Sequence, residues 1–140
     1  MYENYTRQSL PSKEYRELLG SAICVFNSNN SFIIENILRY DSTNTYSWYQ
    51  LIDLESGKLF KPIKETITKN SNTQIAMLFE DIIAKRNRII HSFQITYQGN
   101  QILATKDKNN NQFIITSKYL LDFISQNEEL SNKLHTFRGF

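Results

Sequence analysis

One short segment of this 140-residue sequence concentrates side chains that could carry out chemistry. It reads Lys85, Arg86, Asn87, Arg88, two isoleucines and His91. An arginine presents a rigid fork of donors that matches phosphate oxygens, and a histidine exchanges protons near neutral pH. An asparagine can orient either side chain or contact a phosphate itself. Together these residue types suit the cleavage of RNA without a metal ion, in which a ribose 2′-hydroxyl attacks the adjacent phosphorus.

That reaction assigns a role to each side chain of the segment. His91 would act as general base or general acid, and Arg86 would stabilise the charge that develops on the phosphate. Asn87 completes the expected catalytic set, and Lys85 and Arg88 are the expected contacts to RNA. The products would be a 2′,3′-cyclic phosphate and a 5′-hydroxyl. DNA lacks the 2′-hydroxyl and should resist cleavage.

The spacing decides whether one copy of the chain can assemble this set. On a helix, Asn87 and His91 share one face and lie about 6 Å apart. Arg86 and His91 diverge by roughly 140° around the axis and about 7.5 Å along it. They could meet on one ligand only if the helix end distorts, or if a second copy approaches across a two-fold axis. A symmetric dimer would gather both copies of the set around one cleft.

The same residues also have a purely structural interpretation. A histidine and arginines at the C-terminal end of a helix interact favourably with the helix dipole, and most charged runs are solvated faces. Spacing alone therefore leaves open a helical interaction module whose basic residues only cap a helix. The other histidine, His135, lies beside apolar residues and is expected to be a packed or surface side chain.

A long helix is predicted ahead of the segment. Behind Ser12 as N-cap, apolar residues recur at intervals of three and four as far as about Arg39. The pattern resumes nearly in phase after the polar residues 27–31, so we expect these residues to lie inside one helix. Cys24 is expected to be a small packing residue in it. Two shorter helical pieces should follow, over 48–54 and 59–67.

The segment itself falls late in a second strong helix, from Thr73 to Phe93. After it the hydrophobic period changes from helical to alternating, which predicts short strands separated by turns. A last helix is expected from Ser117 onward, closed by Gly139. The expected strands span 94–97, 101–106 and 112–116.

These elements predict a mainly α fold, an up-and-down helical bundle with a small antiparallel β-hairpin or meander inserted before the last helix. Residues 1–140 are expected to form a single domain, because the length suits one core and the two prolines and four glycines mark no linker. Its expected parts are a helical frame over 11–93, a β insertion at about 94–116 and a C-terminal helix over 117–138.

Composition excludes several classes of protein and site. A net charge of only +2 creates no global field for polyanions, so a nucleic-acid role must come from a local cluster. One cysteine forms neither an internal disulfide nor a cysteine-rich metal site, and no apolar run approaches the roughly 18 residues of a membrane helix. The N-terminus has no signal-peptide pattern. We therefore expect a cytoplasmic protein with no metal, no cofactor and no membrane partner.

The segment resembles the motif of the HEPN superfamily (higher eukaryotes and prokaryotes nucleotide-binding domains). In these all-helical domains an arginine, usually followed by a polar residue such as asparagine, precedes a histidine by four to six intervening residues. Here Arg86 and His91 enclose four residues, Asn87 follows the arginine, and the motif falls late in a long apolar helix. The match covers the helical frame from about residue 11 to residue 93, and the last helix would complete the bundle.

The pattern is similar to the ribonuclease-type members of toxin–antitoxin, abortive-infection and other defence systems. It implies a homodimeric endoribonuclease with a composite active site, in which Arg86 and His91 are catalytic and Asn87 is their polar partner. It also implies a cognate antitoxin, in some members a nucleotidyltransferase that modifies a tyrosine two positions after the histidine. Phe93 stands there and has no hydroxyl to modify. The alternative is a non-catalytic HEPN domain that binds RNA, a nucleotide or a partner protein through the same basic cleft.

Overall fold

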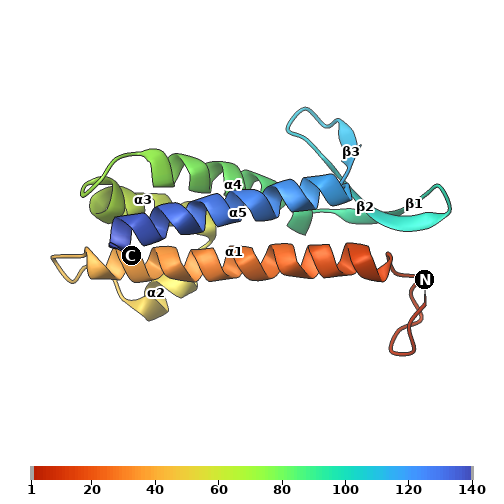
Figure 1. The fold of residues 1–140 in the computed structure, drawn as a ribbon, viewed down its shortest axis with the longest axis horizontal. Coiled ribbons are helices and arrows are strands. Elements are labelled where there is room, and N and C mark those ends of the chain that lie inside the picture. The colour runs from red at the N-terminus through yellow and green to blue at the C-terminus, as the bar shows by residue number, and fades with distance from the viewer. Residues whose placement is uncertain (1, 140) are drawn as a thin grey trace.

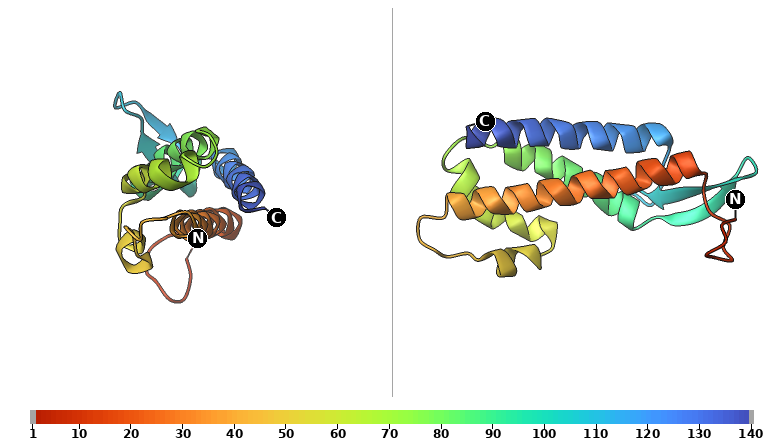
Figure 2. Two further views of the ribbon diagram at one scale, coloured as in Figure 1. Left: turned by 90° about the vertical axis from the view of Figure 1, so that its left-hand side faces the viewer. Right: turned by 60° about the horizontal axis from the view of Figure 1, so that its bottom comes forward.

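Three long helices, α1 (Lys13–Arg39), α4 (Gln74–Ile90) and α5 (Ser117–Arg138), build the body of the computed structural model, which describes residues 2–139. Helices α1 and α5 run in the same direction, and α4 runs antiparallel to both (Figure 1). Seen from one end, the three helices form a triangle in cross-section (Figure 2). The mainly α prediction is confirmed, with a small antiparallel sheet beside the bundle.

Helix α1 runs unbroken through its polar residues. Its first turn is capped by the Ser12 hydroxyl, which accepts a hydrogen bond from the Tyr15 amide at 3.2 Å. Asn29 is buried, and its Nδ2 donates to the backbone oxygen of Asn127 in α5 at 2.7 Å and to its Oδ1 at 3.0 Å. Residues 27–31 therefore lie inside one helix, as predicted, because a polar partner on α5 satisfies the buried amide.

The prediction for Cys24 is wrong, because its side chain is exposed. The face of α1 that meets the core includes Ala22 and Phe26, at 0% and 3% exposure. Cys24 lies two positions from each of them, about 200° around the helix axis, and so points toward solvent.

Four short helical pieces connect α1 to α4. The first predicted piece, 48–54, ends earlier, at Ile52, and Ser56 and Gly57 begin the second of these four. Leu51, Leu59, Ile63 and Ile67 along the connection are completely buried, so it closes one side of the core. The pieces are α2 (Trp48–Ile52), a 3-10 turn η1 (Ser56–Leu59), α3 (Phe60–Ile63) and a π-helical turn η2 (Lys64–Thr68).

A three-stranded antiparallel meander, in the order β1-β2-β3, lies between α4 and α5 in the sequence. Its strands are β1 (Phe93–Tyr97), β2 (Asn100–Lys106) and β3 (Gln112–Ile114), and the β1–β2 hairpin extends past the end of the bundle (Figure 1). The predicted meander is confirmed, although β3 ends at Ile114 and not at residue 116, and the boundary of the preceding helix is also wrong. Helix α4 ends at Ile90 and not at Phe93, because Phe93 pairs with Ala104 in the sheet.

The core is centred on an aromatic stack with one ring from each long helix. Phe26 of α1 stacks on Phe79 of α4 at 6.2 Å between ring centroids, and on Phe123 of α5 at 6.3 Å. All three rings are buried. This stack fixes the three helices against one another, about two turns before Arg86 on α4.

Candidate functional site

The basic side chains of the segment leave α4 in three directions, because successive residues on a helix are separated by about 100°. Lys85 Nζ donates to Oε1 of Gln126 in α5 at 2.7 Å. Arg88 Nη1 donates to the backbone oxygen of Lys106, the last residue of β2, at 2.8 Å. Arg86 lies against α1. A single chain therefore spreads its three cations over three neighbouring elements.

Arg86 is partly buried between α4 and α1. Its guanidinium carbon lies 5.0 Å from the centre of the Phe26 ring, within the range of a cation–π contact. Its Nη2 donates to Oδ1 of Asn87 at 2.9 Å, while its buried Nε has no hydrogen-bond partner within the described residues. Burial lowers the pKa of Arg86, and the negative charge of Glu55 acts in the opposite direction. Arginine still keeps its proton near neutral pH.

His91 lies where α4 gives way to the sheet. Its backbone leaves the helical conformation, with φ −94° and ψ 44°, while its amide still donates to the Asn87 carbonyl at 2.9 Å. The Thr105 hydroxyl of β2 donates to the His91 carbonyl at 3.2 Å, so the backbone is held from both sides. The imidazole is exposed, and no side chain among residues 2–139 forms a hydrogen bond or ion pair with it. A ligand can therefore reach it.

Asn87 links the two proposed catalytic residues. Its side chain holds the Arg86 guanidinium, and its backbone carbonyl holds the His91 amide. No hydrogen bond, ion pair or ring contact joins the guanidinium and the imidazole within the described chain. Arg86 is directed toward α1 and His91 toward solvent.

Several apolar residues near His91 in the sequence are exposed. Ile90 is 52% exposed and Phe93 is 43% exposed, and Tyr97 at the other end of β1 is 46% exposed. Phe93, Ile95 and Tyr97 alternate along β1 and therefore share one face of the sheet. Large apolar side chains gathered on a surface are typical of contacts with another molecule.

The contact of Phe26 with Arg86 could not be predicted from the sequence. The position of Phe26 in α1 marks it only as one of a series of core residues, and no local signal pairs it with a cation on α4. Glu55, Gln126 and Lys106 also could not be predicted, because each is distant from the segment in the sequence and is brought close to it only by the tertiary structure.

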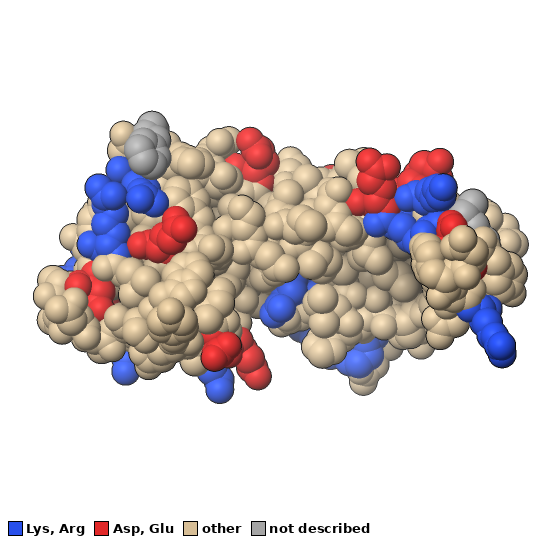
Figure 3. Space-filling model, turned by 90° about the horizontal axis from the view of Figure 1, so that it is seen from below, with Lys and Arg blue, Asp and Glu red and all other residues tan. Residues whose placement is uncertain are grey.

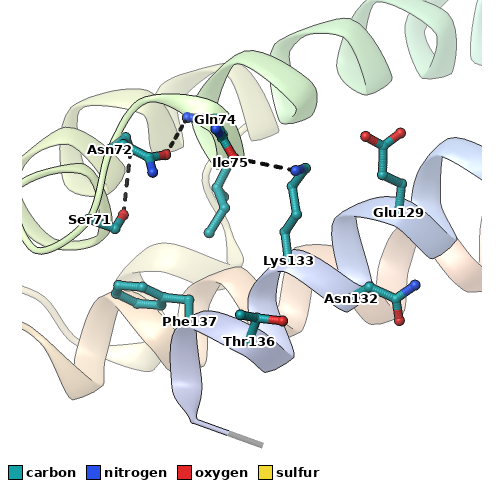
Figure 4. Close-up of a pocket in the computed structure, with 9 residues that line it drawn as sticks. All are labelled: Ser71, Asn72, Gln74, Ile75, Glu129, Asn132, Lys133, Thr136 and Phe137. Atoms are coloured by element: carbon teal, nitrogen blue, oxygen red, sulfur yellow. Dashed lines mark hydrogen bonds between the residues drawn. The ribbon is translucent and has the colours of Figure 1, made fainter.

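A hollow of about 430 Å³ lies away from the segment (Figure 4). It opens between the start of α4 and the end of α5, about 16 Å along α4 from Arg86. Lys133 Nζ crosses it to Oε1 of Gln74 at 3.4 Å. It is lined by Ser71, Asn72, Gln74, Ile75, Glu129, Asn132, Lys133, Thr136 and Phe137.

The surface charge is mixed. On the face seen in Figure 3, lysines and arginines lie in small groups near acidic side chains, with wide uncharged areas between them. No three histidine, cysteine or carboxylate side chains within the described range come together in a way that could hold a metal ion. No helix in the same range has the length and hydropathy needed to cross a membrane.

Comparisons of this chain with protein-family models, with curated proteins and with solved structures find no match.

Proposed function

We propose that this chain is a HEPN-like, metal-independent endoribonuclease that acts as a homodimer in the cytoplasm, as a toxin or defence effector. One observation carries the proposal. Near the end of α4, the Asn87 side chain accepts from the partly buried Arg86 guanidinium. The Asn87 carbonyl accepts from the backbone amide of His91, whose imidazole is exposed. These are the groups that phosphate stabilisation and proton transfer require.

The chemistry is a transesterification that needs no water in its first step. His91 accepts the proton of the ribose 2′-hydroxyl as the 2′-oxygen bonds to phosphorus, and the bond from phosphorus to the 5′-oxygen breaks. The His91 imidazolium formed in this way then gives the proton to the leaving 5′-oxygen. Arg86 stabilises the additional negative charge on the phosphate, and Lys85 and Arg88 attract the RNA backbone.

The divergence of Arg86 and His91 within one chain supports the dimer. A two-fold axis near the end of α4 would bring His91 of one subunit toward Arg86 of the other. It would also bury Ile90 and Phe93, which are exposed in the single chain. A cognate antitoxin would have to mask this surface or the RNA, because Phe93 has no hydroxyl for a nucleotidyltransferase to modify.

Incubation of the purified chain with structured RNA in EDTA tests the proposal. We expect cleavage that leaves 2′,3′-cyclic phosphate ends, and a loss of about 100-fold or more in the His91→Ala variant. The matched control is His135→Ala, because His135 is the other histidine and packs on Phe32 at 4.7 Å between ring centroids. Equal cleavage by folded His91→Ala and wild-type protein would contradict the proposal.

A second function, binding without cleavage, is favoured by a different observation. Lys85 and Arg88 both donate hydrogen bonds to other elements of the same chain, so some of the segment's donors stabilise the fold. A non-catalytic domain of this kind would bind RNA, a nucleotide or a protein partner, and added salt would weaken its binding to RNA. It would release no product in the same incubation.

A further inference from the structure

The Arg86 guanidinium is restrained by two side chains. Its carbon lies over the Phe26 ring, 5.0 Å from the ring centre, and Asn87 Oδ1 accepts from Nη2 at 2.9 Å. Phe26 is itself immobilised, because it is 3% exposed and stacks on Phe79 and Phe123. The position of this cation is therefore set by the aromatic core and not only by α4.

The donors on the guanidinium that remain unpaired point to an anionic ligand. Arg86 has five N–H groups, and within residues 2–139 only one, on Nη2, has an acceptor. Nε is buried without a partner and out of reach of an external ligand, so the donors left for a ligand are on Nη1 and Nη2. A partly buried cation with unpaired donors is stabilised by an oxyanion that accepts from two of them, and phosphate oxygens have that geometry.

We propose that Phe26 is a positioning residue that, together with Asn87, holds the Arg86 guanidinium in the orientation that binds a phosphate oxyanion. The proposal rests on the endoribonuclease function only for the identity of that oxyanion as an RNA phosphate. It assigns a role to a residue of α1 that touches neither RNA nor the reacting atoms. It also defines Asn87 as a residue that acts through Arg86.

The direct test replaces Phe26 with 3,4,5-trifluorophenylalanine in the full chain. Fluorine withdraws charge from the ring face and weakens the cation–π contact while the ring keeps nearly the same shape. The matched control is the same substitution at Phe123, which lies in the same stack and is also buried. Phe123 has no cation–π contact with Arg86 among the described contacts.

Two readouts separate this inference from the proposed function. The first is the NMR signal of the Arg86 Nε–H group, followed without RNA as inorganic phosphate is added. We expect trifluorination of Phe26 to increase guanidinium mobility and to weaken phosphate binding about 5- to 30-fold, and trifluorination of Phe123 to change neither. The second is RNA cleavage, in which kcat should fall by a similar factor with little change in KM.

The outcomes are distinct. If phosphate shifts the Arg86 signal and trifluorination of Phe26 weakens that effect in a chain that cleaves no RNA, the positioning role is supported and the ribonuclease proposal fails. If wild-type protein cleaves RNA but trifluorination of Phe26 changes neither the Arg86 mobility nor kcat, the positioning role is overturned. Equal effects at Phe26 and Phe123 also overturn it, because they would report only the packing of the stack.

Discussion

Arg86 is the residue whose chemistry is most tightly specified by its surroundings. In the proposed role it lies over the Phe26 ring and donates to Asn87 while it keeps other donors for a phosphate. A guanidinium is planar and has five donors, whereas a lysine ammonium is a point charge at the end of a flexible chain. Charge alone is therefore insufficient at this position.

We predict that Arg86→Lys lowers kcat/KM for RNA cleavage by about 100-fold even though it retains the positive charge. Arg88→Lys is the comparison, because Arg88 bonds a single backbone carbonyl that an ammonium can also reach. Steady-state cleavage assays on both variants check the prediction. Wild-type rates in Arg86→Lys would show that a simple cation suffices.

Tyr46 allows a prediction about pH. Its hydroxyl donates a hydrogen bond to the Glu65 carboxylate, which raises the pKa of Tyr46 to about 12 from its usual 10.0. The folded chain therefore keeps this proton between pH 10 and 12, where the unfolded chain loses it. The contribution of this hydrogen bond to the free energy of unfolding is complete below about pH 10 and is lost as the pH rises toward 12.

We expect the difference in unfolding free energy between wild type and Tyr46→Phe to shrink across that interval. Urea unfolding at a series of alkaline pH values measures this difference. Tyr49→Phe is the control, since Tyr49 is 83% exposed and should give no such trend. A difference that stays constant from pH 10 to 12 would contradict the role of Glu65.

At the scale of the elements, buried polar contacts set how the helices align. The Asn29 amide donates twice to Asn127, whose own Nδ2 donates to the Phe123 carbonyl at 2.9 Å. These bonds join α1 and α5 at matching heights in the core. A shift of one helix along the other would leave several buried polar groups without partners.

We predict that Asn29→Ala lowers the free energy of unfolding by about 1–3 kcal/mol, because it leaves the buried Oδ1 of Asn127 without its donor. Asn127→Ala should be similarly destabilising, and the double variant should lose less than the sum of the two. Urea denaturation of the four proteins provides the double-mutant cycle. Strict additivity would show that the two amides do not interact.

The elements also show what the sequence could predict. Periodicity and the Ser12 cap were sufficient to predict α1, because both signals are local. The end of α4 was predicted too late, because Ile89 and Ile90 continue the apolar pattern and only the pairing of Phe93 with Ala104 ends the helix. The segment with Arg86 and His91 could be identified by residue type, but the contact of Arg86 with Phe26 depends on tertiary packing.

At the scale of the whole molecule, the proposed active site requires two copies of the chain. Ile90 and Phe93 lie beside His91 and are exposed by about half, so we expect a dimer to cover them. The double variant Ile90→Ser/Phe93→Ser should therefore be monomeric at concentrations where the wild type is dimeric, and it should lose cleavage activity. Sedimentation equilibrium measures the association.

Met77 provides the control for that experiment. It is 63% exposed on the same helix, thirteen residues before Ile90, or about 20 Å along the axis. Met77→Ser should leave both the dimer and its activity unchanged. A double variant at Ile90 and Phe93 that dimerises like the wild type would place the interface elsewhere.

The composite site is tested most directly by subunit mixing. Arg86→Ala and His91→Ala chains with different affinity tags are unfolded, refolded together and purified as the heterodimer. Each parent homodimer should be inactive, whereas the heterodimer should recover about half of the wild-type activity, because one of its two sites combines an intact Arg86 with an intact His91 from the other subunit. A heterodimer as inactive as its parents, beside an active wild-type dimer, would contradict the claim that the two residues act across the two-fold axis.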